Sequence, residues 1–191
     1  MNKSEHTSLP EVMVFTPARF HDERGFFSET YQDAGFKAAG LPADIVFVQD
    51  NFSLSRPAGT VRGLHYQAPP MAQSKLVRVI RGSILDVAVD VRRGSPRYGQ
   101  HVSVELSAEN ARQLFVPKGF LHGFITLEPD TEVAYKVDAY YSKPHDGAVL
   151  WNDPSLGIDW GPLASQGVVS QKDAQATRFA AFTTPFDYLP G

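Results

Sequence analysis

Cysteine is missing from the 191-residue sequence, which excludes disulfide bonds and thiolate chemistry. Long apolar runs are missing too: none approaches the ~20 residues of a membrane-spanning helix, and the segment 1–10 is polar rather than signal-like. Charge of one sign is not in excess, since the net charge is only −3. Such a chain has no electrostatic footprint for nucleic acid. We therefore expect a cytoplasmic protein with neither a membrane nor a nucleic-acid partner.

The chain also lacks internal repeats, low-complexity segments and a Pro/Ser-rich linker. Its length suits one domain with a full hydrophobic core, so we expect 1–191 to form a single domain with 174–191 as a C-terminal tail. Aromatic residues, in contrast, are abundant, with thirteen Phe and seven Tyr. This composition is typical of a β-rich protein with a lined cavity.

Alternating apolar and polar residues recur in many short stretches separated by turn residues. The stretches are 11–20, 25–31, 46–54, 75–80, 84–91, 102–106, 114–116, 123–127 and 131–140. Their number indicates an all-β sandwich or barrel, with a few short helices at 33–40 and 173–181. The stretches 75–80 and 84–91 flank Arg81-Gly82-Ser83, which predicts a hairpin. In the second of these stretches Asp86 and Asp90 lie on one face, and the valines lie on the other.

Two histidines carry the chemical signal. His65 lies in the stretch 61–67 and His122 in the stretch 116–124, each within a few residues of a glycine. Lys75 lies between them along the chain, and Tyr135 follows. All four fall on or beside expected strands, and the mouth of a β-barrel can hold a ligand. We expect them to converge in one cavity, either as an acid–base site or as most of a metal site.

The spacing Pro117-x-Gly119-x-x-His122 resembles the second half-motif of the cupin superfamily of β-barrels. Many cupins bind a metal through His-x-His and a glutamate in the first half-motif, joined by this later histidine. Here Gln67 replaces the second histidine, no acidic residue follows at the usual spacing, and Lys75 stands nearby instead. A divalent ion needs three or four ligands and is repelled by an ammonium group. We therefore expect no metal, which disfavours a metal-dependent cupin oxygenase or isomerase.

Without a metal, the same groups suit proton transfer next to a carbonyl. A neutral imidazole of His65 or His122 can take a proton from an acidified carbon, while Lys75 or the second histidine stabilises the enolate oxygen. A tyrosine hydroxyl on the opposite face can return the proton and invert the centre. Asp173 or Asp86 could hold the imidazole base. Taken singly, each residue has an ordinary structural explanation, so only their joint presence favours catalysis.

Longer motifs give a specific resemblance. The chain resembles the dTDP-4-dehydrorhamnose 3,5-epimerase family, whose members are cupin-fold sugar-nucleotide epimerases. The matching segments run in family order from about Val12 to Asp173, and they are Asp22-Glu23-Arg24-Gly25-Phe26-Phe27, Gln49-Asp50-Asn51, Arg62-Gly63-Leu64-His65-Tyr66-Gln67, Ala72-Gln73-Ser74-Lys75-Leu76-Val77, Leu106-Ser107-Ala108-Glu109-Asn110, Pro117-Lys118-Gly119-Phe120-Leu121-His122-Gly123-Phe124, Trp151-Asn152-Asp153-Pro154 and Ser170-Gln171-Lys172-Asp173. The resemblance implies a cupin-type double-stranded β-helix, that is, a jelly-roll barrel.

The resemblance also implies roles for individual residues. His65 would be the general base, oriented by Asp173, and Tyr135 the acid on the opposite face. Lys75 would face the C4 keto oxygen, with His122 near the sugar. The remaining matched positions would bind the nucleotide, its diphosphate or the sugar, and they are Arg24, Glu29, Gln49, Asn51, Arg62, Asp146 and Lys172. The family is typically a homodimer with exchanged N-terminal strands, so Arg24 and Glu29 would serve the neighbouring subunit's site.

The implied reaction needs no cofactor: inversion of C3 and/or C5 of a dTDP-4-keto-6-deoxyhexose, in rhamnose-type deoxysugar biosynthesis. Relatives in antibiotic-sugar pathways invert C3 or C5 alone with the same catalytic set, and the motifs do not decide how many centres are inverted. A mono-epimerase or keto-isomerase of a related sugar nucleotide is therefore the alternative with the same fold. A non-catalytic sugar-nucleotide-binding cupin would be expected to lack the base or the acid. The segment Asp146-Gly147-Ala148 departs from the family, which often has Arg before this Gly, and leaves the base preference open.

Overall fold

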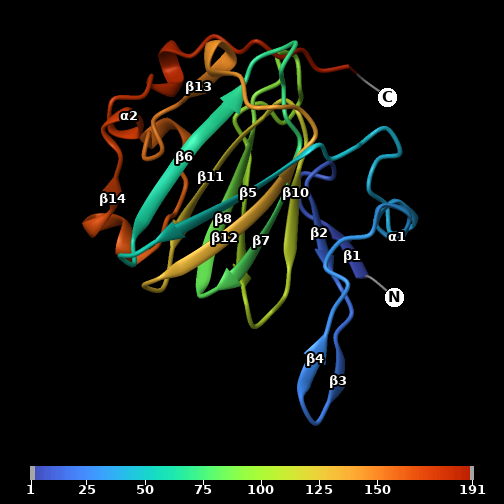
Figure 1. Cartoon of the computed structure of the whole chain (residues 1–191). Coiled ribbons are helices and arrows are strands. Elements are labelled where there is room, and N and C mark those ends of the chain that lie inside the picture. Colours follow the sequence, from blue (N-terminus) through green and yellow to red (C-terminus); the bar gives the residue numbers. More distant parts are fainter. Residues whose placement is uncertain (1–2, 190–191) are drawn as a thin grey trace.

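Two β-sheets dominate the computed structural model, which describes residues 3–189 (Figure 1). The first sheet consists of β1 (Lys3–His6), β2 (Met13–Thr16), β5 (Gln49–Ser55), β7 (Lys75–Arg81), β10 (Gln113–Val116) and β12 (Thr131–Val137). Its spatial order is β1-β2-β10-β7-β12-β5, and every neighbouring pair is antiparallel. The long crossovers between neighbours are those of a jelly roll.

The second sheet consists of β6 (Thr60–Gln67), β8 (Ser83–Asp90), β9 (His101–Ser107), β11 (Phe120–Thr126), β13 (Asp146–Ala148) and β14 (Val168–Val169). Its order is β13-β6-β11-β8-β9, and β14 runs parallel to β6. A separate hairpin of β3 (Phe20–Asp22) and β4 (Gly25–Phe27) extends away from the barrel (Figure 1). The all-β prediction is thus confirmed.

Helices are few and short. They are α1 (Asp33–Ala38), α2 (Gln171–Ala174) and the 3-10 helices η1 (Lys143–His145), η2 (Pro154–Leu156), η3 (Pro162–Gln166) and η4 (Phe179–Ala181). The expectation of one helix over 173–181 is wrong, because Thr177 pairs with Val149 in an extended bridge that separates α2 from η4. No helix within residues 3–189 combines the length and apolar character needed to cross a membrane.

The predicted hairpin around Gly82 is also wrong. β7 pairs with β10 and β12 in the first sheet, whereas β8 pairs with β9 and β11 in the second. Gly82 therefore carries the chain from one sheet to the other. Its φ is +77°, and a Cβ there would collide with the side chain of Thr131, so a glycine is required.

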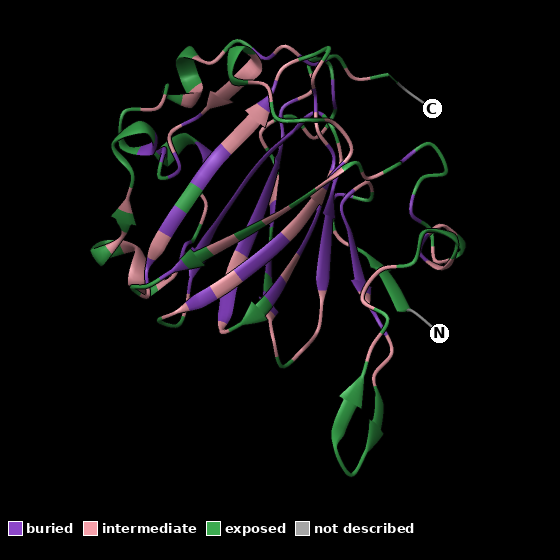
Figure 2. Ribbon diagram, in the orientation of Figure 1, coloured by how far each residue is buried: buried purple, intermediate pink, exposed green. Residues whose placement is uncertain are grey.

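Three apolar clusters form the core. Figure 2 shows that the buried residues lie mainly along the strands of the two sheets. The first lies between the sheets and includes Val77 of β7, Val133 of β12 and Ile84 and Ala88 of β8. The second covers the outer face of the second sheet with side chains from the C-terminal third, and the third covers the outer face of the first sheet around α1.

Both faces of β8 are consequently buried. Asp86 has the same parity along the strand as Ile84 and Ala88, so its side chain points into the barrel, where the residue has no exposed surface. The barrel interior therefore contains an ionisable group as well as apolar side chains.

Candidate active site

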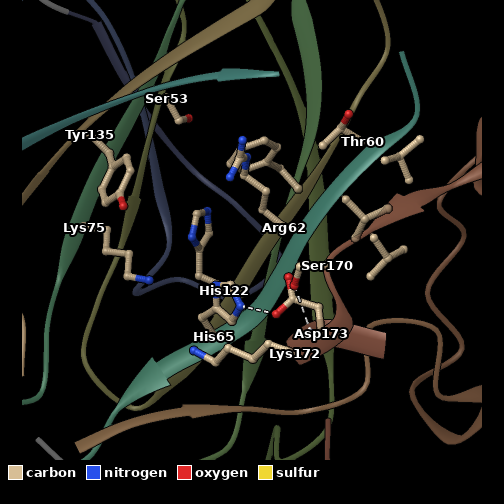
Figure 3. A pocket seen from close by; sticks show the side chains of 14 residues that line it. Ser53, Thr60, Arg62, His65, Lys75, His122, Tyr135, Ser170, Lys172 and Asp173 are labelled. Atoms are coloured by element: carbon tan, nitrogen blue, oxygen red, sulfur yellow. Dashed lines mark hydrogen bonds and ion pairs between the residues drawn. The ribbon is translucent and has the colours of Figure 1, made fainter. Parts of the chain in front are cut away.

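A cavity of about 460 Å3 is lined by side chains from both sheets (Figure 3). Tyr135 and Lys75 reach it from the first sheet, and His65 with Asp173 reaches it from the second sheet and α2 (Figure 3). The complete lining is Ser53, Thr60, Val61, Arg62, His65, Lys75, His122, Phe124, Tyr135, Val168, Val169, Ser170, Lys172 and Asp173. The structure thus brings His65, Lys75, His122 and Tyr135 together, as the strand pattern predicts.

An irregularity in β6 allows Arg62 and His65 to face the same cavity. Residues three apart on a regular strand point to opposite faces. Here the register shifts between the pairs His122↔His65 and Phe124↔Arg62, so β6 uses one more residue than β11 over this interval. Such a bulge re-aims side chains, and both Arg62 and His65 line the cavity as a result.

His65 is held by a buried carboxyl group. Its Nε2 lies 2.7 Å from Oδ1 of Asp173, a residue that is only 3 % exposed. Asp173 is fixed in turn, because its backbone N–H donates to the Oγ of Ser170, the N-cap of α2. Burial alone would raise the pKa of Asp173, but the hydrogen bond and charge of His65 outweigh it and lower that pKa. With Nε2 bound to Asp173, the Nδ1 atom of His65 is the nitrogen left for a substrate.

A second histidine–carboxyl pair lies beside the first. His122 Nε2 is 2.6 Å from Oδ1 of Asp86, and both residues are buried. His122 and His65 are direct partners in the β11–β6 register. Burial lowers the pKa of His122; Lys75 and His65 lower it further, while Asp86 opposes these effects.

Lys75 and Tyr135 supply the remaining acid–base groups. Burial lowers the pKa of Lys75 to about 8, although Asp86 and Asp146 counteract it. Burial is also the main reason that the pKa of Tyr135 is raised, so its hydroxyl stays protonated at neutral pH. The cavity therefore combines an imidazole, an ammonium with a reduced pKa and a phenol, which is a set suited to proton transfer.

A second cavity of about 310 Å3 adjoins the first and shares His65, Lys75, Tyr135 and Lys172 with it. Gln49, Asn51 and Asp146 line it, together with Tyr66, Gln67, Gln73 and Tyr141. The Gln49 amide donates to Oδ1 of Asn51 at 2.8 Å and accepts from the backbone N–H of Tyr141 at 3.0 Å.

The entrance to this second cavity carries an ion pair between Lys172 and Asp146, which raises the pKa of Lys172. Tyr141, 59 % exposed, also contacts Asp146 through its hydroxyl. The two cavities together could hold a ligand with both polar and flat apolar parts.

Two of the expected residues lie elsewhere. Arg24 is on the β3–β4 hairpin with its side chain 84 % exposed, and it pairs with Asp22. Glu29 lines a different cavity, against α1. Neither side chain lines the cavities that contain His65.

Comparison with known proteins identifies the family. The model of the dTDP-4-dehydrorhamnose 3,5-epimerase family matches residues 6–181. The dTDP-4-dehydrorhamnose 3,5-epimerase of Sinorhizobium fredii is 50% identical over 182 residues, which cover 95% of this chain and 92% of the relative. The chain belongs to the dTDP-4-dehydrorhamnose 3,5-epimerase family.

Solved structures of the family support the same fold. A Legionella pneumophila dTDP-6-deoxy-D-glucose-3,5-epimerase in complex with dTDP-4-keto-L-rhamnose superposes with a TM-score of 0.93 at 41% identity, over 100% of both chains. A more distant match is a 3′-monoepimerase from Streptomyces bikiniensis in complex with dTDP-quinovose, with a TM-score of 0.85 and 30% identity over 92% of this chain and 87% of that one. The cupin-type jelly roll expected from the sequence is therefore confirmed.

The donor set of this family member does not fit a divalent cation. Within residues 3–189 no group of three or more His, Cys, Asp or Glu side chains is placed to hold a metal ion. The Nε2 atoms of His65 and His122 already bind carboxyl groups, and Lys75 would bring a positive charge next to a bound cation.

Sequence reasoning left three residues out of the expected site. From the sequence, Asp86 is a candidate only for holding the imidazole base; alternation places it on the same face as Ile84 and Ala88 but does not show that this face is the inner one. Ser170 could be found from the spacing Ser170-x-x-Asp173, which is typical of a helix N-cap. Tyr141 lies in a loop with no motif of its own, so only the fold reveals it.

Proposed function

We propose that this enzyme inverts both C3 and C5 of a dTDP-4-keto-6-deoxyhexose, with His65 as the base and Tyr135 as the acid. The observation that carries this proposal is their placement: the His65–Asp173 pair and the Tyr135 hydroxyl enter one cavity from opposite sheets, with Lys75 beside them. Membership of the epimerase family makes the chain an isomerase. The double inversion and the residue roles are the proposed part.

Each inversion removes one proton from a carbon and delivers another proton to the opposite face of that carbon. His65 Nδ1 takes the proton from C5 or C3, and the electron pair moves to the C4 oxygen as an enolate. The Lys75 ammonium stabilises that oxygen. Tyr135 then donates its proton to the opposite face of the same carbon and becomes a phenolate. The imidazolium and the phenolate return to their starting states by proton exchange with water.

The same site serves two centres because C3 and C5 both adjoin the C4 carbonyl. The nucleotide is proposed to lie in the adjoining cavity, bound by Gln49, Asn51 and Lys172, with its diphosphate against Arg62 of the first cavity. An arginine fork suits a pair of diphosphate oxygens. Arg62 currently donates to Oγ of Ser55 and to the carbonyl of Leu54, both at 3.2 Å, contacts weak enough to be exchanged for a diphosphate. The Lys172 ammonium would exchange its ion pair with Asp146 for a contact with the diphosphate.

Proton NMR of dTDP-4-keto-6-deoxyglucose incubated with the protein in deuterated water tests this proposal. Deuterium is expected at both C3 and C5, because Tyr135 exchanges with solvent between turnovers. Exchange at one carbon alone would make the chain a mono-epimerase. No exchange at either carbon, with dTDP still bound, would indicate a non-catalytic nucleotide-sugar-binding protein.

We further propose that the enzyme is a homodimer in which the β3–β4 hairpin and the segment that follows it supply Arg24 and Glu29 to the neighbouring subunit. The hairpin supports a dimer because its side chains Phe20, Phe26 and Phe27 are 61%, 55% and 69% exposed. Exposed large apolar side chains that lie together are typical of a protein–protein interface. On the outer face of the first sheet Phe52 is likewise 63% exposed.

Mixing two inactive variants tests the shared site. A dimer of one Arg24→Ala and one His65→Ala chain has one intact site only if Arg24 acts across the interface. Each mixed dimer formed by co-expression should then have up to half of the activity of an unaltered dimer, because one of its two sites is intact. Mixed dimers without activity, or a monomer in light scattering, would contradict the proposal.

A further inference from the structure

Asp86 does not line the catalytic cavity itself, but it binds His122, which does. It has no exposed surface, and Oδ1 binds His122 at 2.6 Å. Within residues 3–189 its other oxygen, Oδ2, has no hydrogen-bond partner. A buried carboxyl oxygen without a partner costs free energy, so a structural role alone explains this residue poorly.

The bond to Asp86 decides which nitrogen of His122 carries a proton. A carboxylate can only accept, so Nε2 of His122 must donate. In the neutral ring Nδ1 then has a free lone pair, and it has no hydrogen-bond partner within the described chain. Burial and the neighbouring Lys75 both lower the pKa of His122, which favours this neutral form. The side chain lines the cavity in which the sugar is proposed to bind.

We propose that Asp86 is a positioning residue: it fixes His122 as a hydrogen-bond acceptor for a sugar hydroxyl, and it maintains the positive charge of Lys75. This inference rests on the proposed function, because it assumes that the sugar occupies the cavity. It adds a residue that acts through two others, without itself lining the cavity.

The second part of the proposal follows from charge. Lys75 and His122 line the same cavity, and Asp86 binds the imidazole of His122 at 2.6 Å from inside the barrel. From this position its carboxylate charge favours the protonated form of Lys75, against the effect of burial. Other charged or titratable groups also line the cavities around Lys75, and they are Arg62 and His65 of β6, His122 of β11, Tyr135 of β12, Asp146 of β13, and Lys172 and Asp173 of α2. Asp86 and Asp146 are the two carboxyl groups that favour the ammonium form of Lys75. Of these, Asp86 is fully buried, so water screens its charge less.

The tautomer of His122 can be read first, on the unaltered protein. Nitrogen-15 NMR of histidine-labelled protein should show His122 protonated at Nε2 and bare at Nδ1 near neutral pH, with the His122→Asn protein providing the assignment. Protonation at Nδ1 would overturn the inference without any substitution at Asp86.

Asp86→Asn then tests the coupling, and Asp90→Asn is its matched control. Asp90 lies four residues further along the same inner face of β8 and is equally buried, but its carboxyl group binds Arg92 and Ser95. The Asp86→Asn protein should show KM raised about 10-fold, and the alkaline limb of its kcat–pH profile should move about one unit lower as Lys75 loses its partner charge. Asp90→Asn should lower stability and leave both quantities unchanged.

The outcomes separate this inference from the proposed function. If the unaltered protein exchanges deuterium into the sugar while Asp86→Asn keeps the original KM and alkaline limb, the positioning role is overturned and the proposed function stands. A shift of KM and limb of equal size in Asp90→Asn would also overturn it, since a general loss of packing would then suffice. If the unaltered protein catalyses no exchange, the proposed function fails first, and the NMR tautomer still reports on the Asp86–His122 pair.

Discussion

Gly63 and Gly123 lie in direct backbone contact across β6 and β11. A Cβ built on Gly63 would sit 2.5 Å from the Cα of Gly123 and 2.8 Å from the carbonyl oxygen of His122. The φ of Gly63 is +132°, which is strained for any residue with a side chain. This contact lies at the bulge that turns both Arg62 and His65 toward the cavity.

Gly63→Ala is therefore expected to damage the site and the fold together. Backbone strain and overpacking against Gly123 should lower the free energy of unfolding by about 3 kcal/mol or more. Gly25→Ala is the control, since Gly25 has a similar φ of +128° but open space where its Cβ would go. Urea denaturation should show a loss of about 1–2 kcal/mol for Gly25→Ala. Equal losses in the two variants would show that strain alone matters and that the contact with Gly123 does not.

Removal of the base should abolish chemistry but not binding. His65→Asn is expected to lower kcat by about 10²–10⁴-fold, because no other imidazole in the cavity occupies its position. The affinity for dTDP, measured by calorimetry, should stay within about 3-fold of the original. Even if His65 makes a hydrogen bond to the nucleotide, the loss of one hydrogen bond between neutral groups changes the binding free energy little. Deuterium exchange at the original rate would remove His65 from the mechanism.

Tyr135→Phe should separate the two halves of the reaction. The phenol hydroxyl is lost, but the ring still lines the same cavity as Lys75. His65 can still remove a proton and return one to the same face, so deuterium exchange should persist while net inversion falls at least about 100-fold. Inversion at the original rate would contradict the role of Tyr135 as the acid.

Sequence periodicity predicts part of this site and fails where the strands are irregular. His65, Lys75, His122 and Tyr135 lie on strands, so alternation alone indicates a shared interior. Arg62 and His65 are three residues apart, and a regular strand would separate them; the bulge that unites them depends on contact with β11, which is non-local.

Gly82 shows a different limit. A glycine between two strands is the signal of a tight hairpin, but it equally permits a crossing from one sheet to the other.

The burial of Asp86 could not be predicted for a third reason. Alternation assigns the aspartates and the valines of β8 to opposite faces. Only the structure shows that side chains from the C-terminal third pack against the valine face, so that the aspartate face is the one inside the barrel and both faces are buried.

Chelation should leave the enzyme active. Both imidazoles use Nε2 to bind carboxyl groups, and the Lys75 ammonium lies in the same cavity. Dialysis against EDTA should therefore change kcat by less than about 2-fold, since residues 3–189 place no three His, Cys, Asp or Glu side chains where they could bind one divalent ion. Stoichiometric iron, zinc or manganese in the purified protein, with activity lost on its removal, would require a metal-dependent mechanism instead.

Activity should fall in alkaline solution as Lys75 loses its proton. Burial lowers the pKa of Lys75 to about 8, so the ammonium form, which stabilises the enolate, is present below that pH and disappears above it. Lys75→Arg keeps a positive charge at all accessible pH values, so its alkaline limb near pH 8 should vanish even if kcat is lower throughout.

Lys75→Met fills a similar volume without a charge and should lower kcat about 10²–10³-fold at every pH. These profiles, measured by deuterium exchange at saturating substrate, separate the charge of Lys75 from its shape. A limb near pH 8 that survives in Lys75→Arg would assign this titration to another group. Tyr135 would not explain such a limb, because burial moves its pKa upward, away from pH 8.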